Sequence, residues 1–188
     1  MSVKESLKFV QRWIFHPKQM GTFLPLPSKV GRILVSSLPT LSESDYILEI
    51  GSGTGALTKF LYHNPKLSKN LICAEIDSEL CKILNKKFPD AKIINKSAAD
   101  LDLTLDQSLL NRIKIIVSSV PFTCINQDSK DKIMKICSQL LNNGASMFHI
   151  SYNPYLNLNL SSYGIKQIYK KRIFSIPMVF LHSYMSLR

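Results

Sequence analysis

Three glycines and two carboxylates in the first half of the chain have types and spacing that suit a cationic cofactor. Gly51, Gly53 and Gly55 stand at alternate positions directly after a short apolar run. Glu49 lies two residues before the first glycine, and Glu75 comes twenty residues after the last one. An apolar strand that runs into a glycine-rich turn and then a helix is the layout of a nucleotide-cofactor loop in an α/β sheet.

The position of Glu49 favours a positively charged cofactor over a dinucleotide. A helix N-terminus attracts a pyrophosphate through its dipole and free N–H groups, and a carboxylate beside it opposes that attraction. The G-x-G-x-G spacing also differs from the G-x-G-x-x-G of dinucleotide sites. We therefore expect S-adenosylmethionine, which carries a sulfonium and an ammonium group, and hence a methyltransferase.

Each residue of this group has an expected role. The glycines let the backbone pass close to the methionine part of the cofactor, where a Cβ would collide. Ser52 and Thr54 offer hydroxyls or backbone amides. Glu49 either receives the ammonium through water or holds the loop by accepting hydrogen bonds without touching the ligand. Glu75, at the end of the second strand, accepts both ribose hydroxyls.

The elements that position these residues alternate between strand and helix from residue 45 onward. Apolar runs predict strands over residues 46–50, 70–75, 92–95, 113–118, 145–152, 165–174 and 178–187. Helical spacing predicts helices over residues 56–61, after Asp77 or Ser78, and from about residue 130 to Asn143-Gly144. Two more helices are predicted ahead of the sheet, over residues 2–16 and 28–38, the second capped by Ser28. We expect one domain over residues 1–188, with an N-terminal helical annex at 1–44 and a catalytic core at 45–188.

The composition points to an anionic partner. The chain has 24 Lys and Arg against 13 Asp and Glu, a net charge of +11, which suits nucleic acid or an acidic membrane surface, although solvated surface lysines are the simpler explanation. No apolar run approaches the ~18 residues of a membrane span, and no signal peptide or metal site is expected. The four cysteines form no C-x-x-C pair and are expected to be reduced thiols of a cytoplasmic protein: Cys73, Cys81, Cys124 and Cys137.

The order of the elements resembles the class I methyltransferase fold over roughly residues 20–188. That fold is α/β, a Rossmann-like seven-stranded sheet that is mostly parallel, with an antiparallel last strand and helices on both faces. The resemblance implies that Ile76 packs on the adenine ring. Such proteins often read the adenine edge with an acid followed by a small residue. Here Ser97-Ala98 occupy those positions without the acid, which Asp100 could supply instead.

The end of the fourth strand bears on the substrate. Methyltransferases that act on planar base amines often have Asn or Asp where Ser119 stands, because the side-chain carbonyl accepts from the amine and aims its lone pair. A serine hydroxyl does not reproduce that aimed carbonyl. Phe122 either lines a pocket for an amine or its methylated cation or packs in the core. Ser119 and Phe122 are nevertheless candidate catalytic residues, together with Tyr152, and Ser118 is assigned to the cofactor site.

The chain resembles the bacterial phospholipid N-methyltransferases, which convert phosphatidylethanolamine stepwise toward phosphatidylcholine. The likeness rests on residues 25–29, Ile47–Gly55, Ser118–Pro121, Ser151–Pro154 and Lys171–Pro177. It implies that residues 2–16 form an amphipathic helix that binds anionic membranes, although this helix could instead pack on its own domain.

The same resemblance gives candidate residues for the acceptor. Tyr152 matches a family tyrosine that orients the headgroup or accepts its proton, whereas His149 and His182 are expected to be structural. Lysines and arginines are candidates for the lipid phosphate: Lys29, Arg32, Lys170, Lys171 and Arg172.

The chain is also similar to the rRNA adenine dimethyltransferases, through residues 21–24 and its basic charge. The missing Asn opposes that function, and the 44 residues after Gly144 are all needed for the sheet, so we expect no separate RNA-binding domain. Our expectation is an N-methyltransferase of phosphatidylethanolamine-type phospholipids, peripheral at the cytoplasmic face of the membrane. RNA adenine methylation and a non-catalytic cofactor-binding protein are the alternatives. The sequence leaves open the number of methyl transfers and the oligomeric state.

Overall fold

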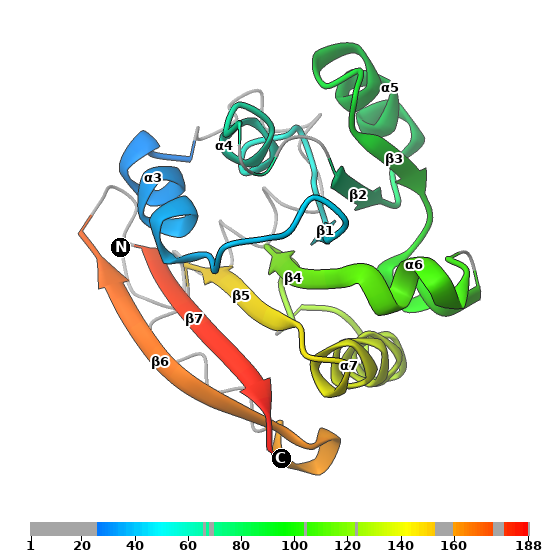
Figure 1. The fold of residues 1–188 in the computed structure, drawn as a ribbon, viewed down its shortest axis with the longest axis vertical. Helices are drawn as coiled ribbons and strands as arrows, with labels where there is room; N and C mark the ends of the chain where they lie inside the picture. The colour runs from blue at the N-terminus through cyan, green and yellow to red at the C-terminus, as the bar shows by residue number, and fades with distance from the viewer. Residues whose placement is uncertain are drawn as a thin grey trace.

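The computed structural model describes residues 26–65, 67, 70–103, 105–122, 124–152, 160–174 and 179–187. Their centre is a seven-stranded sheet of order β3-β2-β1-β4-β5-β7-β6 (Figure 1). Five strands are parallel: β1 (Tyr46–Ile50), β2 (Leu71–Glu75), β3 (Lys92–Asn95), β4 (Ile113–Ser118) and β5 (Ser146–Ser151). β7 (Val179–Ser186) runs antiparallel to both of its neighbours, β5 and β6 (Ile165–Ile173). The predicted mostly parallel sheet with an antiparallel last strand is confirmed.

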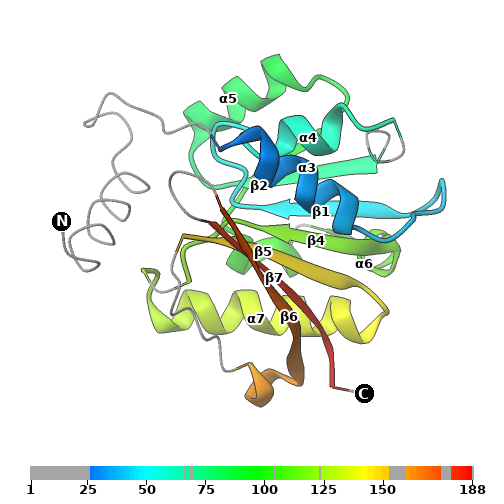
Figure 2. The same ribbon diagram turned by 90° about the vertical axis from the view of Figure 1, so that its left-hand side faces the viewer.

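Helices cover both faces of the sheet, which explains why the central strands are nearly all apolar. One face carries α3 (Ser28–Ser37), α4 (Thr58–Tyr62) and α5 (Ser78–Lys87). The other carries α6 (Gln107–Arg112) and α7 (Gln127–Asn142) (Figure 2), with 3-10 turns at Ala98–Leu103 and Ser161–Tyr163. Apolar side chains from each group of helices form a separate buried cluster against the sheet.

The helix boundaries follow local hydrogen-bonding chemistry. Asp77 caps α5 by accepting hydrogen bonds from the N–H groups of Glu79 and Leu80, and Gly144, with φ of +87°, follows the end of α7. Two predicted starts were wrong. Ser28 is the first residue of α3 and makes no capping bond, because Pro27 takes the N-cap position, and α4 begins at Thr58.

Some expectations fall on residues outside the described part of the chain. These are the helix over residues 2–16 and the stretches 21–24, 153–154 and 175–177 that contributed to the family resemblances. Among the described residues, none of the helices is both long and apolar enough to cross a bilayer, and no His, Cys, Asp and Glu cluster could hold a metal ion. All four cysteines are free thiols.

A pair of buried histidines joins β5 to β7. His149 and His182 are register partners with ring centroids 6.0 Å apart. His149 Nδ1 lies 3.2 Å from the Ser118 hydroxyl on β4, and His182 stacks on Tyr184. Burial lowers the pKa of His149 to about 3 and that of His182 to about 4, so both are neutral near pH 7 and serve as packing groups.

The burial of His149 predicts a loss of stability in acid. Between pH 6.5 and about 3 the unfolded chain binds a proton at this position that the folded protein does not. Stability is therefore unaffected by this group above pH 6.5 and falls below it, by about 1.4 kcal/mol per pH unit. In urea unfolding at pH 7, 6, 5 and 4, His149→Gln should lose that much less stability per unit than the wild type. Equal slopes for the two proteins would show that His149 is already charged in the fold.

Candidate functional site

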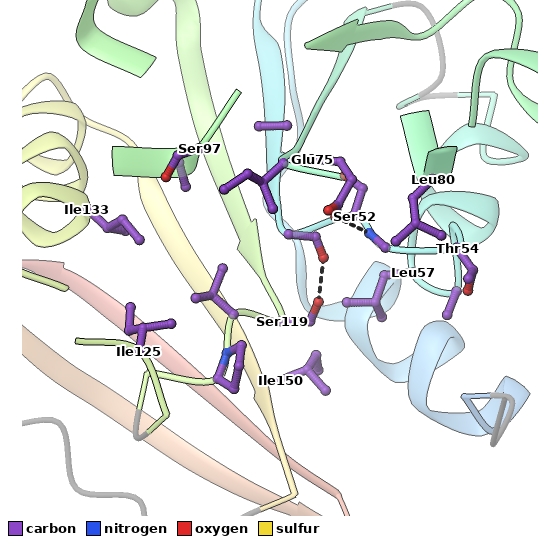
Figure 3. A pocket seen from close by; sticks show the side chains of 18 of the residues that line it. Ser52, Thr54, Leu57, Glu75, Leu80, Ser97, Ser119, Ile125, Ile133 and Ile150 are labelled. Carbon is purple, nitrogen blue, oxygen red and sulfur yellow. Dashed lines mark hydrogen bonds between the residues drawn. The ribbon is translucent and has the colours of Figure 1, made fainter. Parts of the chain in front are cut away.

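A cavity of about 430 Å³ opens where the parallel strands end. Its walls come from the segments that follow β1, β2, β3 and β4 and from the end of β5 (Figure 3). In an open parallel sheet this is the edge at which ligands bind, because the strand order reverses there and the connecting loops diverge. The loop from Gly51 to Thr54, together with Glu75, Ser97 and Tyr152, lines this cavity, as the sequence predicted.

Glu75 ties the glycine loop to the end of β2. One oxygen of its carboxylate accepts the Gly53 N–H at 2.8 Å, and the other accepts the Asp77 N–H at 3.0 Å. Figure 3 shows the first of these bonds across the floor of the cavity. Each carboxylate oxygen has a second lone pair, and the side chain lines the cavity, so the arrangement can still accept two hydroxyls from a ribose.

The three glycines of the loop have different reasons to be glycine. All have positive φ, of +73°, +57° and +86° in order, which side chains disfavour. A Cβ on Gly53 would meet nothing within 4 Å, whereas one on Gly51 would lie 2.9 Å from a Val120 methyl. A Cβ on Gly55 would lie 2.4 Å from the Phe88 ring of the residue that follows α5. The expectation that Gly55 admits the cofactor is therefore corrected: this glycine lets the loop pack on Phe88, and it does not line the cavity.

Glu49 lies beneath the loop and away from the cavity wall. It is fully buried, and its Oε2 accepts from the Thr58 hydroxyl at 2.6 Å and the Cys73 thiol at 3.6 Å. Its Oε1 is buried and has no hydrogen-bond partner among the described residues. Burial raises the pKa of Glu49 to about 7. The structure thus gives Glu49 a structural role: it joins β1 to Thr58 of α4 and to Cys73 of β2, and it does not line the cavity.

One end of the cavity suits a flat apolar ring. Ile76 is 71% exposed and lines the cavity, and Ala98 faces the same space. Ser97, Ile125 and Ile133 lie together on the other side of Glu75 from Leu57 and Thr54 (Figure 3). Exposed apolar surface of this kind becomes buried when a ring covers it. Ser97 is thus the polar group at the expected adenine edge, whereas Asp100, the alternative, does not line the cavity.

Of the residues at and just after the end of β4, some line the cavity and others lie in the core. Ser119 lines the cavity, and its hydroxyl donates to the Gly51 carbonyl at 2.9 Å (Figure 3). Ser118 is fully buried, with its hydroxyl against His149 and the Val120 N–H. Phe122 is 3% exposed and packs on His149, with ring centroids 5.1 Å apart. The assignments of Ser118 to the cofactor and of Phe122 to the acceptor are corrected: the Ser118 hydroxyl is bonded within the core, and the Phe122 ring packs on His149 and does not line the cavity.

The far end of the cavity is apolar apart from one phenol. Tyr152, half-buried, lines it together with Leu26, Leu57 and Ile150, and burial raises the pKa of Tyr152. Leu26 and Leu57 were not predicted, because nothing in the sequence distinguishes a leucine that lines a cavity from one in the core. The five basic candidates for a lipid phosphate, on α3 and β6, do not line the cavity.

This geometry is that of the class I methyltransferases, and comparison with solved structures agrees. A TehB-like S-adenosylmethionine-dependent methyltransferase from Corynebacterium glutamicum superposes with a TM-score of 0.63 at 14% identity, over 98% of this chain and 100% of that one. At this identity the likeness concerns the fold alone.

The sequence model of the ribosomal RNA adenine dimethylase family matches residues 15–150, and the chain belongs to this family. The prediction of a class I S-adenosylmethionine-dependent methyltransferase is thus confirmed at the level of family and fold. Ribosomal RNA small subunit methyltransferase A of Hydrogenobaculum sp. is 36% identical over 88 residues, which are 47% of this chain and 32% of that protein. The chain therefore spans about a third of the length of that relative. The ornithine lipid N-methyltransferase of Singulisphaera acidiphila is 19% identical over 157 residues, which are 82% of this chain and 81% of that protein.

The position of Glu75 predicts the effect of removing its carboxylate. Glu75→Ala should weaken binding of S-adenosylmethionine or its demethylated product about 10- to 100-fold, because charged hydrogen bonds to the loop and the ribose are lost together. Isothermal titration calorimetry measures this directly. Glu79→Ala is the matched control, an exposed acid on the adjacent helix whose ion pair with Lys82 lies on the surface. Equal cofactor affinities for the two variants would show that Glu75 does not contribute to cofactor binding.

The burial of Glu49 predicts that stability falls as the pH rises, which is opposite in direction to the effect predicted for His149. Its raised pKa means that the folded protein keeps a proton which the unfolded chain releases above pH 4.5, so stability from this group is lost as the pH rises to about 7. Glu49→Gln removes that cost, and this variant should be about 1–3 kcal/mol more stable than the wild type at pH 8. Urea unfolding should show the advantage shrinking at pH 5. A difference independent of pH would mean that Glu49 is not titrating in the fold.

Proposed function

We propose that this protein is an S-adenosylmethionine-dependent N-methyltransferase whose acceptor is the aliphatic amine of an amino lipid. The observation that carries the choice of acceptor is Ser119, whose hydroxyl is directed to the Gly51 carbonyl at the position where methyltransferases of planar base amines often have an amide or acid. The apolar cavity end beside Tyr152 supports it.

The cavity fits the cofactor. Glu75 would hold the ribose, the backbone from Gly51 to Thr54 would hold the methionine part, and Ile76 with Ala98 would cover the adenine next to Ser97. When bound, the cofactor supplies a methyl group already activated on a sulfonium. The contribution of the protein is then to position the acceptor and to exclude water.

The acceptor end suits an amine that must lose a proton. An alkylammonium brought between Leu26, Leu57 and Ile150 leaves water for apolar surroundings, which lowers its pKa and favours the neutral, nucleophilic form. Tyr152 is the polar group there and can hold the amine by a hydrogen bond. An adenine amine would instead need a carbonyl to aim its lone pair. Ser119 does not provide one, because its side chain carries a hydroxyl and not a carbonyl, and the bond to the Gly51 carbonyl fixes where that hydroxyl lies.

The relatives support two substrate classes. The similarity to the ornithine lipid N-methyltransferase extends over most of both chains, at low identity. The family match and the more identical relatives favour a second candidate, methylation of an rRNA adenine, which the basic charge also suits. With a lipid acceptor, the protein would bind peripherally at the cytoplasmic face of a membrane, and residues 2–16 would be one membrane-binding segment.

The test is transfer of a radiolabelled methyl group to defined acceptors. With labelled cofactor we expect label in phosphatidylethanolamine or ornithine lipid presented in mixed detergent micelles, and none in undermodified small-subunit rRNA. Tyr152→Phe should lower the lipid rate about tenfold through loss of one hydrogen bond while leaving the cofactor Kd unchanged.

Tyr62→Phe is the control for that substitution, because the Tyr62 hydroxyl bonds Asp90 on the surface, away from the cavity. Label that enters only the RNA would overturn the lipid proposal and leave the methyltransferase assignment standing. Cofactor binding without transfer to either acceptor would favour a non-catalytic role.

A further inference from the structure

Positive charge in this chain is concentrated at its two ends. Residues 26–131 contain 13 Lys and Arg and 12 Asp and Glu, so the cofactor-binding part is nearly neutral. Residues 132–188 contain seven Lys and Arg and neither Asp nor Glu. A uniformly lysine-rich surface would not show this division, so the C-terminal charge calls for its own explanation.

Four of these seven cations lie on one strand. β6 is an edge strand, paired on one side only with β7, and its burial pattern leaves just the two terminal residues buried. Lys166, Lys170, Lys171 and Arg172 are all exposed on it. Because neighbouring strand residues point to opposite faces, Lys170 and Lys171 place cations on both faces of the strand. Figure 1 shows β6 as the outermost strand of the sheet.

Apolar side chains stand among these cations. Ile168 is 51% exposed and Phe174, just beyond the strand, is 68% exposed. Ile168 lies at the irregularity in the pairing of β6 with β7. The Arg172 guanidinium lies 4.9 Å from the Phe174 ring. Cations interleaved with exposed aliphatic and aromatic groups match the boundary between lipid headgroups and acyl chains, where each kind of group finds its own environment.

The strand register connects this surface to the cavity. Lys171 pairs with Leu181 on β7, and Leu181 pairs with Ile150 on β5. Directly paired residues point to the same face of a sheet, and Ile150 lines the acceptor end of the cavity. Two strand spacings, about 10 Å, therefore separate Lys171 from the cavity wall.

We propose that this β6 surface, formed by Lys166, Ile168, Lys170, Lys171, Arg172 and Phe174, docks the protein on an anionic phospholipid bilayer. The docked bilayer lies beside the Tyr152 end of the cavity, from which a lipid amine enters. This inference rests on the proposed lipid acceptor for its purpose, whereas its binding test uses no methyl transfer.

Two other occupants fit less well. A second copy of the chain pairing edge to edge would place the cations of two β6 strands together, which is how proteins prevent such pairing. Single-stranded RNA is held in basic grooves by stacking on aromatic rings, whereas this surface is a strand rim with one exposed ring and an aliphatic side chain. The bilayer makes use of both the charge and the apolar groups.

The test compares two triple variants of the full chain that remove equal charge. Lys170→Gln/Lys171→Gln/Arg172→Gln alters the β6 surface, and Lys82→Gln/Lys86→Gln/Lys92→Gln alters α5 and β3 at the opposite edge of the sheet. Cosedimentation is measured with vesicles of phosphatidylethanolamine and phosphatidylglycerol. The β6 variant should partition roughly 100-fold more weakly than the wild type, about fivefold for each cation. The opposite-edge variant should stay within about threefold of it.

A separate substitution probes the apolar part. Phe174→Ser should weaken vesicle binding about tenfold without changing its salt dependence. The substitution removes apolar area that the bilayer would bury, and it removes no charge. Phosphatidylcholine vesicles should bind none of the proteins appreciably.

The outcomes test the β6 surface separately from the proposed lipid acceptor. Equal weakening of the two triple variants would overturn the β6 surface, as would binding of the wild type to RNA and not to vesicles. If the β6 variant loses vesicle binding but still methylates lipid in micelles at the wild-type rate, both proposals are supported. If the wild type methylates no lipid and the β6 variant alone loses vesicle binding, the surface stands and the proposed acceptor fails.

Discussion

The site depends on the carboxylate of Glu75, which bridges the backbone N–H of Gly53 to that of Asp77. The first bond fixes the glycine loop, which is held in a left-handed conformation that a free chain would leave readily. The second fixes the start of α5, whose own cap is Asp77. One side chain thereby sets the distance between the loop after β1 and the residue after β2. Those two segments would hold the ends of the cofactor, so a change in the Glu75 carboxylate would alter the protein contacts along the whole cofactor.

Beneath this bridge lies a second carboxylate with a different function. Glu49 holds α4 through Thr58 and is surrounded by buried groups, with one oxygen unpartnered among the described residues. Burying an acid in this way costs free energy that a neutral residue would not. The sequence alone leaves the role of Glu49 open, because an acid just ahead of the glycine loop could face either the ligand or the core. The side-chain alternation along β1 and the packing of α4 decide that it faces the core.

The strands of the sheet were predicted well from the sequence because their apolar runs are a strong signal. The apolar runs of β1 and β4 were located to the residue, since a strand covered on both faces has little freedom in composition. α6 and the 3-10 turns were missed because such short segments carry too few apolar positions to show a period. Within the site, the loop, Glu75, Ile76 and Ser97 were found from spacing. Ser118 and Phe122 were misplaced because three-dimensional packing decides which side chains at and beyond the end of β4 reach the cavity. Leu26 and Leu57 were missed for the same reason, since apolar residues carry no chemical signature.

In the proposed function, separate segments of the chain form the cofactor half and the acceptor half of the cavity. The cofactor half of the cavity consists of backbone, one carboxylate and apolar surface, and none of these depends on what receives the methyl group. The acceptor half is formed by the end of β4, the end of β5 and residues ahead of α3, which are separate segments. At the end of β4 the Ser119 hydroxyl is bonded to the Gly51 carbonyl, and the proposed choice of acceptor rests on this side chain. Membership of an RNA-methylating family therefore fixes the donor chemistry more firmly than the acceptor. The distribution of charge toward β6 bears on the acceptor independently, because it concerns the surface from which the substrate arrives.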